Sequence, residues 1–480
     1  MSNQKKKLIK GTIWSVFGQT ASLLIILATN IWLARLLSPK EFGQVGVIMF
    51  FIALATVFTE SGLSGALVRK QDATKEDYST VFVTNLIFSI FCFIIIYFSS
   101  GFIASYYEDD QIKDLLIVAG LILIINAFQI TQNAKLVSDM KFKEKSIYRF
   151  IAVVISSIIG LYFAYNEFGV WALILIQLLT AGFNTILLWI FEGFFLKLYF
   201  SKNSFKELYS FGVNTTLASL LNSGFDNIYQ LVLAKYFSVS ETGYFYQAKK
   251  LQDIPGGVIS LATQSVIFSS LSKLQDDKQA FTKVYNKITL YLLVLLGFVS
   301  TFIYFYAEVI ILLLYGKEWI GAIYYMQLLT IASFFYMQEN LNRVIFKVFN
   351  QTRKILYLEY VKKTIQALSI GIGIYYLSLQ ILIIGFVITN TLGYLINYYY
   401  SRKIIGSVGN YELLAIFKVC IISVLTVLII SYLSVKLKLQ GNMLFLISPF
   451  SLLFYLVGLY VFKVINIKNE LKTFLKLYKR

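Results

Sequence analysis

Long apolar segments separated by short loops dominate this sequence. Each segment has about 20–30 residues, which is enough for an α-helix to cross roughly 30 Å of hydrocarbon. With 58% hydrophobic residues, the chain has more apolar surface than a soluble domain could bury. The pattern predicts an all-α integral membrane protein with about fourteen transmembrane helices, or twelve if the last two segments are one misjudged pair. The predicted spans lie near 12–36, 42–67, 79–101, 113–137, 147–165, 168–191, 207–237, 242–272, 284–306, 319–348, 355–377, 379–400, 412–435 and 442–462.

Basic residues are concentrated in the loops on one side of this arrangement. If the N-terminus lies inside, 33 of the 43 Lys and Arg residues fall in inner segments and 7 in outer ones. This asymmetry follows the positive-inside rule and predicts a multi-pass protein with both termini in the cytoplasm. It also explains the net charge of +18 without a nucleic-acid partner. The basic N-terminus resembles a signal peptide, but no small-residue cleavage site follows, so we expect residues 12–36 to remain as the first span.

Several kinds of chemistry are disfavoured because the chain lacks the residues or the long loops that they need. It has no His, which removes His metal ligands, bases and proton relays, and its two Cys lie in apolar runs. No loop exceeds about twenty residues, so a soluble catalytic or nucleotide-binding domain has no room. We therefore predict no catalytic residues, no metal, no cofactor and a transporter of secondary type. The acidic run Glu108-Asp109-Asp110 could bind a divalent ion, but a solvated cap is the favoured reading.

The sequence repeats itself with an offset of 200 residues. The segment from Leu33 to Gly43 matches the segment from Leu233 to Gly243, and each has a basic residue, a short turn and then Glu-x-Gly. Six spans per copy give both copies the same orientation, which predicts parallel lobes that enclose a central cleft. We assign 1–200 to an N-lobe, 201–403 to a C-lobe, and 404–480 to two appended helices and a basic cytoplasmic tail.

Polar side chains recur every three or four residues on two neighbouring predicted helices, 207–237 and 242–272. Such stripes face each other or water, because lipid offers them no partners, and a charge at membrane depth costs roughly 2.5–3.5 kcal/mol. If Asp226 pairs with one of Lys249 and Lys250, the other lysine has no counter-charge on this hairpin. A lysine in that position suits a phosphate group, so we interpret the hairpin as the wall of a cavity for an anionic substrate. The alternative is a buried ion pair that only joins the helices, Asp226 with Lys249 or Lys250. The substrate candidates are Lys249, Lys250, Asp253, Asn222 and Tyr246.

Other polar residues within predicted spans suggest ion and gate sites. Asp226 and Glu60 are candidates for ion coupling or for intramembrane pairing, and for Glu60 a structural role is an equal alternative. Gln338, Glu339 and Arg343 are candidates for an inner gate, although the four-residue spacing of the last two also fits a local ion pair. Arg35 is the outer-gate candidate. Its alternative is to extend towards the membrane interface.

An ordered set of short motifs resembles a known family. The motifs are Leu37-Ser38-Pro39-Lys40-Glu41-Phe42-Gly43, Gly62-Leu63-Ser64-Gly65-Ala66-Leu67-Val68, Phe168-Gly169-Val170-Trp171-Ala172-Leu173, Phe211-Gly212, Gly243-Tyr244-Phe245, Ala248, Pro255 and Leu271-Ser272-Lys273-Leu274-Gln275-Asp276-Asp277. Together they resemble the polysaccharide-transport branch of the multidrug/oligosaccharidyl-lipid/polysaccharide exporter superfamily, within which the Wzx-type lipopolysaccharide and teichuronic-acid flippases are nearest.

The resemblance implies two six-helix lobes like those of MATE and MurJ transporters, plus two helices, in a bacterial plasma membrane. It also implies alternating access for a polyprenyl-pyrophosphate-linked oligosaccharide, with the pyrophosphate at Lys249 and Lys250. Relatives use ion gradients, so Na⁺ or H⁺ would act at Asp226 and Glu60. The partners would be membrane lipids, glycosyltransferases and a polysaccharide polymerase. One departure is Gln247, where the family pattern often has a basic residue.

Two other functions remain as alternatives. An ion-coupled multidrug antiporter of the same architecture would favour carboxylates over lysines in its cavity, because its cargo is cationic. A membrane glycosyltransferase or polymerase needs a large outer loop, and no predicted loop is large enough. The sequence therefore favours a lipid-linked oligosaccharide flippase.

Overall fold

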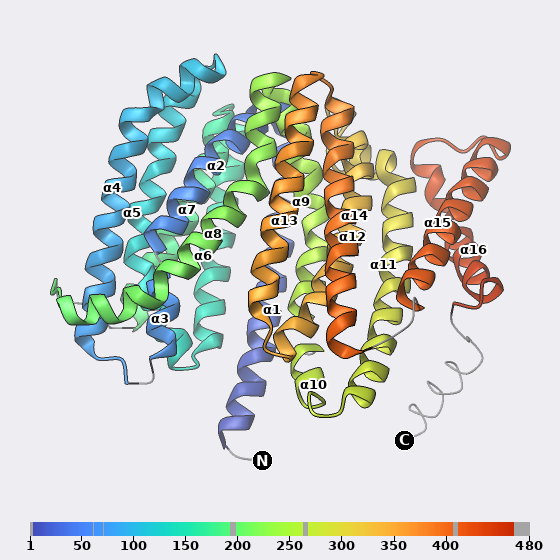
Figure 1. Cartoon of the computed structure of the whole chain (residues 1–480). Coiled ribbons are helices and arrows are strands. Elements are labelled where there is room, and N and C mark those ends of the chain that lie inside the picture. Colours follow the sequence, from blue (N-terminus) through green and yellow to red (C-terminus); the bar gives the residue numbers. More distant parts are fainter. Residues whose placement is uncertain are drawn as a thin grey trace. The chain divides into compact units, whose positions relative to one another are not determined.

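The structure is a computed structural model that describes residues 3–60, 62–70, 72–192, 198–262, 267–406 and 411–464. In these ranges every regular element is helical, as Figure 1 shows. Most predicted spans coincide with one long helix. Span 42–67 also covers the short helix Leu63–Arg69, and span 242–272 also covers Phe268–Ser272. The last span covers a 3₁₀ segment and a helix, Gly441–Ile447 and Ser448–Val461. The all-α membrane fold predicted from the sequence is confirmed.

Ten helices of the described chain are long and apolar enough to cross a membrane. Four other predicted spans coincide with continuous helices of 24–35 residues. Charged and amide side chains occur within the apolar sequence of these four helices. At 1.5 Å per residue these four could still cross roughly 30 Å. Fourteen crossings are therefore consistent with the helices, and the count stays a prediction. The four are α8 (Lys202–Tyr236), α9 (Val239–Ala262), α12 (Ala322–Val348) and α13 (Thr352–Tyr375).

The chain forms two compact units, residues 1–247 and 248–480, and each is described by itself. The boundary falls inside the continuous helix α9, so α8 and the first part of α9 belong to unit 1. The lobe boundary near residue 200 comes from the sequence repeat and stays a prediction.

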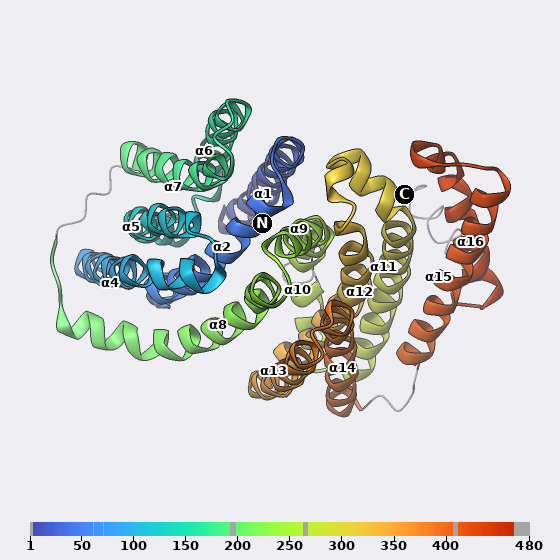
Figure 2. The ribbon, with the colours of Figure 1, turned by 90° about the horizontal axis from the view of Figure 1, so that it is seen from above.

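Unit 1 is built from neighbouring helices that pack in pairs. Helix α4 packs on α5, α6 packs on α7 and on α1, and α8 packs on α2, α3 and α4. Figure 2 shows from above how α8 runs past α4 and α2. One face of α5 is fully buried at Leu115, Leu116 and Leu123. The helices are α1 (Asn3–Leu36), α2 (Pro39–Glu60), α3 (Leu63–Arg69), α4 (Lys75–Tyr107), α5 (Gln111–Ser138), α6 (Phe142–Tyr165) and α7 (Val170–Glu192).

Unit 2 is organised around α12, which packs on α11 and α14. Two apolar cores form along these helices, one around Tyr394 and Val419 and the other around Phe281 and Ile345. Helix α15 packs on α11, and α16 packs on α15. The elements after α9 are α10 (Phe268–Ser272), α11 (Lys278–Leu314), η2 (Lys317–Trp319), α14 (Leu379–Ile405), α15 (Tyr411–Lys436), η3 (Gly441–Ile447) and α16 (Ser448–Val461).

A buried carboxylate attaches α15 to the rest of unit 2. Glu412 is 4% exposed, forms an ion pair with Arg402 of α14, and accepts hydrogen bonds from Asn342 Nδ2 at 3.1 Å and the Tyr394 hydroxyl at 3.0 Å. Ser401 donates to the Asn342 side-chain oxygen at 2.7 Å, which fixes the orientation of that amide. The first of the two C-terminal helices is thus joined to the core by a network in which each partner restrains the next.

We predict that Arg402→Leu destabilises unit 2 by about 3–5 kcal/mol, because it leaves the Glu412 carboxylate buried without its counter-charge. The double variant Arg402→Leu with Glu412→Leu should recover most of that loss, since both charges are then absent. Thermal unfolding of the detergent-purified protein measures both effects. Equal unfolding temperatures for wild type and Arg402→Leu would contradict the assignment.

Candidate functional site

The predicted substrate lysines lie near the middle of α9. Lys249 and Lys250 are half-buried, and Asp253, one turn further on, is exposed. By helical rise, Lys249 is about 15 Å from the start of α9, so the pair would lie at depth if α9 crosses the membrane as predicted. Pro255 and the two glycines after it could bend or break the helix, and α9 is continuous through this position. The side chain of Pro255 lies outside the described residues.

The other predicted polar face belongs to α8. Asn222 and Asp226 are both exposed, and their four-residue spacing places them on one face. Tyr246 of α9 is half-buried beside Gly46 of α2, where an added Cβ would lie 3.7 Å from its ring. Glu60, the last residue of α2, and Arg35, in the last turn of α1, are exposed. Their assigned roles stay predictions.

The ion pair expected between Glu339 and Arg343 is confirmed, and it is part of a larger network. The Glu339 side chain is fully buried and also pairs with Lys362 of α13 at 2.7 Å, while Arg343 pairs with Glu359 of α13. Asn397 Nδ2 of α14 donates to Glu339 at 3.2 Å. The network holds α12, α13 and α14 together, so it restrains the residues predicted to form an inner gate.

Gln338, the third inner-gate candidate, differs from its neighbours. It is fully buried, and among the described residues neither polar atom of its side chain has a hydrogen-bond partner. An unsatisfied buried amide costs about 1–3 kcal/mol. The gate role of these three residues stays a prediction.

The two copies of the sequence repeat touch each other through their glycines. A Cβ on Gly43 of α2 would lie 1.8 Å from the carbonyl oxygen of Val239, and a Cβ on Gly243 of α9 would lie 1.9 Å from the carbonyl oxygen of Pro39. The contact is reciprocal, because each glycine meets the residue four positions before the other. Only glycine permits such an approach of two helix backbones. We call this contact the glycine crossing.

Acidic residues in the turn between α4 and α5 contact α2 and α8 at the end of unit 1 that contains the glycine crossing. Asp109 accepts from Gln44 Nε2 at 2.8 Å and lies 3.7 Å from the ammonium of Lys40. Lys235, at the end of α8, donates to the Tyr106 carbonyl at 2.7 Å and pairs with Glu108 at 3.4 Å. Two members of the acidic run therefore form side-chain contacts to α2 and α8, where the sequence analysis favoured a solvated cap.

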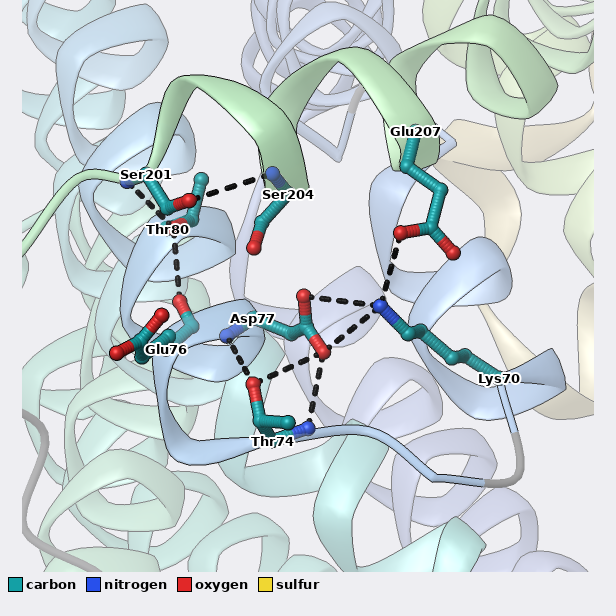
Figure 3. Close-up of polar contacts among 8 residues, drawn as sticks. All are labelled: Lys70, Thr74, Glu76, Asp77, Thr80, Ser201, Ser204 and Glu207. Carbon is teal, nitrogen blue, oxygen red and sulfur yellow. Dashed lines mark hydrogen bonds and ion pairs between the residues drawn. The ribbon is translucent and has the colours of Figure 1, made fainter.

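The opposite end of α8 is attached through Lys70, as Figure 3 shows. The Lys70 ammonium lies 3.0 Å from both Asp77 of α4 and Glu207 of α8. Although desolvation alone lowers it, the hydrogen bonds to these carboxylates raise the pKa of Lys70. Thr74 forms a capping box with Asp77, and Ser201 N donates to Thr80 Oγ1 at 3.0 Å. Both ends of α8 are thus tied to α4.

Several residues of these contacts were missed in the sequence analysis. Lys362, Glu359 and Asn397 complete the network of Glu339, and Asn30 donates to Gln247 at 2.7 Å. Their partners are far away in sequence, so no local spacing reveals them. Gln247 had a signal, since it departs from the family pattern.

Solved structures similar to this chain show the class of the fold. The lipid II flippase MurJ in its inward closed conformation matches with a TM-score of 0.72 and 17% identity, covering 96% of this chain and 100% of that one. An inward-facing multidrug-resistance MATE transporter of the MOP superfamily matches with a TM-score of 0.62 and 20% identity, covering 80% and 94%. The chain is a multi-pass membrane protein with the fold of the MOP transporters.

The chain belongs to the polysaccharide biosynthesis protein family, whose family model matches residues 32–324. The succinoglycan biosynthesis transport protein ExoT of Rhizobium meliloti (strain 1021) is 23% identical over 65% of this chain, and the match spans 64% of ExoT. The teichuronic acid biosynthesis protein TuaB of Bacillus subtilis (strain 168) is 20% identical over 71% of each chain. The family resemblance inferred from the motifs is confirmed.

We predict that Gly43→Ala loosens the glycine crossing, because its Cβ overlaps the Val239 carbonyl and strain of this kind costs about 1–3 kcal/mol. A cysteine introduced by Thr242→Cys, at a fully buried position, should then react about tenfold faster with a membrane-impermeant maleimide. The background carries Cys92→Ser and Cys420→Ser.

Gly101→Ala is the matched control, because no atom lies within 4 Å of its added Cβ. It should leave the labelling rate unchanged. Equal rates for Gly43→Ala and Gly101→Ala would show that the crossing does not protect Thr242.

Proposed function

We propose that this protein is a flippase for a polyprenyl-pyrophosphate-linked oligosaccharide. It moves the lipid-linked glycan from the cytoplasmic to the outer leaflet of a bacterial plasma membrane by alternating access, for cell-surface polysaccharide. The observation that carries the proposal is the family match over residues 32–324 on a chain with the MurJ fold. The relatives named for succinoglycan transport and teichuronic acid biosynthesis support the same class of cargo.

The pyrophosphate is the substrate group that the lysines suit. Two adjacent ammonium groups near the middle of α9 carry a charge that hydrocarbon penalises by roughly 2.5–3.5 kcal/mol each. A pyrophosphate brings the opposite charge to the same depth and accepts charge-assisted hydrogen bonds. In this proposal Lys249 and Lys250 bind the pyrophosphate, while Asn222, Tyr246 and Asp253 line the path.

Transport in the proposal is driven by an ion gradient. No loop between the described helices is long enough to hold a nucleotide-binding domain, which supports transport that is not driven by ATP. Asp226 and Glu60 are the proposed sites for Na⁺ or H⁺, since each is an exposed carboxylate on a helix of unit 1. The basic inner loops support cytoplasmic termini.

We predict that Lys249→Ala with Lys250→Ala reduces surface polysaccharide at least tenfold in a deletion strain that carries the variant. Each lost charge-assisted hydrogen bond removes about 1.5–3 kcal/mol of binding, and tenfold corresponds to about 1.4 kcal/mol. Lys249→Arg with Lys250→Arg keeps both charges and should retain most of the export.

Lys418→Ala is the control for removing a lysine from a membrane helix, because Lys418 lies half-buried on α15. It should export normally at equal membrane abundance. Normal export by the double alanine variant would refute the pyrophosphate role.

A multidrug antiporter is the second candidate, because MATE transporters share the fold. The two lysines are poorly suited to a cationic drug. Efflux of a cationic dye from intact cells, with no change in surface polysaccharide on deletion, would favour the antiporter.

A further inference from the structure

Amide side chains cluster beside the glycine crossing in unit 1. They come from α1, α8 and the first part of α9, and all are at most 3% exposed: Asn30, Gln230 and Gln247. Asn30 Nδ2 donates to Gln247 Oε1 at 2.7 Å, and Gln230 Nε2 donates to Asn227 Oδ1 at 3.4 Å. Thr242 Oγ1 donates to the Gln230 carbonyl at 3.1 Å, which joins α9 to α8. We call this group the amide layer.

The amide layer has hydrogen-bonding capacity that the structure leaves unused. Two of its atoms are buried without a hydrogen-bond partner among the described residues: Gln230 Oε1 and Gln247 Nε2. A buried amide atom in this condition is costly, and an apolar side chain of similar shape would avoid the cost. Amides at this contact therefore suit a second state in which the same atoms meet a polar ligand.

The surroundings of the layer indicate the chemistry of that ligand. An added Cβ on Gly46 would lie 3.1 Å from Thr242 Cγ2, 3.7 Å from the Tyr246 ring and 3.9 Å from Gln230 Oε1. The bare backbone of Gly46 therefore adjoins both an aromatic ring and an unsatisfied amide oxygen. Sugar rings present hydroxyl groups that donate and accept, together with apolar faces that pack on aromatic rings. Neutral amides beside a tyrosine match both features.

We propose that Asn30, Gln230, Gln247 and Tyr246 form a subsite for the hydroxyl groups of a glycan, which is engaged when the glycine crossing opens. This inference rests on the proposed flippase function and names the residues that recognise its sugar. Tyr246 and Lys250 are one turn apart on the same face of α9. That spacing suits a sugar that is bonded directly to a pyrophosphate. Gln247 thus contacts the glycan, where a basic residue would contact an anion.

The test separates glycan recognition from pyrophosphate binding in the full-length protein in nanodiscs. Two probes are used: bare undecaprenyl diphosphate, and the lipid-linked oligosaccharide extracted from cells that lack this protein. Wild type should bind the glycolipid at least tenfold more tightly than the bare diphosphate. Asn30→Leu with Gln247→Leu should lose that preference and bind the bare diphosphate within twofold of wild type.

Thermal unfolding distinguishes recognition from a structural role. Replacing both partners of the amide pair by apolar groups removes their mutual hydrogen bond together with the unpartnered Gln247 Nε2, so the unfolding temperature should be unchanged or raised. The matched control is Gln129→Leu with Asn184→Leu, a hydrogen-bonded amide pair between α5 and α7 in the same unit. It should retain the preference for the glycolipid.

Two results would overturn the inference. One is a double variant that keeps the glycolipid preference, and the other is a variant that loses stability together with affinity for both probes. Neither touches the proposed function, since wild type still binds the glycolipid in both. If wild type itself binds neither probe, the proposed function fails instead.

Discussion

The arrangement of helices in unit 1 depends on a contact between two helix backbones. At the glycine crossing the first turns of α2 and α9 approach until neither Gly43 nor Gly243 has room for a Cβ. Such contacts are short-ranged, because a gap of about 0.5–1 Å already removes a quarter to a half of the van der Waals attraction. A contact of this kind is either formed or absent, and that property suits a gate with two states.

The amide layer and the acidic run lie around this crossing and differ in what they contribute. Lys40 and Lys235 form exposed or partly exposed ion pairs with Asp109 and Glu108, which are weak and easily exchanged with water. The buried amides are expensive to leave half-satisfied. In the closed arrangement, the unpartnered buried amide atoms therefore cost free energy. In the proposed subsite, a polar cargo would offset that cost by hydrogen bonding to these atoms when the helices separate.

Buried carboxylates within the helices of unit 2 are neutralised by networks. Glu339 and Glu412 each sit in a network with a cation and a neutral donor, and both networks join helices that are separate in sequence. Satisfied networks of this kind rigidify a helix bundle. By contrast, Asp226 of α8 is exposed, and Lys249 and Lys250 of α9 are half-buried. The networks of Glu339 and Glu412 are therefore structural, and a transport role for Asp226, Lys249 and Lys250 stays a proposal.

Much of the fold could be predicted from the sequence, because helix length and apolar composition are local properties. The repeat also identified Gly43 and Gly243 as equivalent, although their mutual contact was not foreseen. The i, i+4 pair of Glu339 and Arg343 followed from helical geometry. Partners such as Lys362 for Glu339, or Asn30 for Gln247, 217 residues away, depend on helix packing that no local pattern encodes. The roles of Lys249, Lys250 and Asp226 remain predictions.

The most direct measurement is the distance between spin labels at Lys40→Cys and Ser240→Cys, one on each turn of the glycine crossing, in a background of Cys92→Ser and Cys420→Ser. Double electron–electron resonance should give a single short distance between the two labels in the resting protein. Lipid-linked oligosaccharide extracted from cells that lack the transporter should add a longer one. A single distance that the glycolipid does not change would contradict a crossing that opens for its cargo.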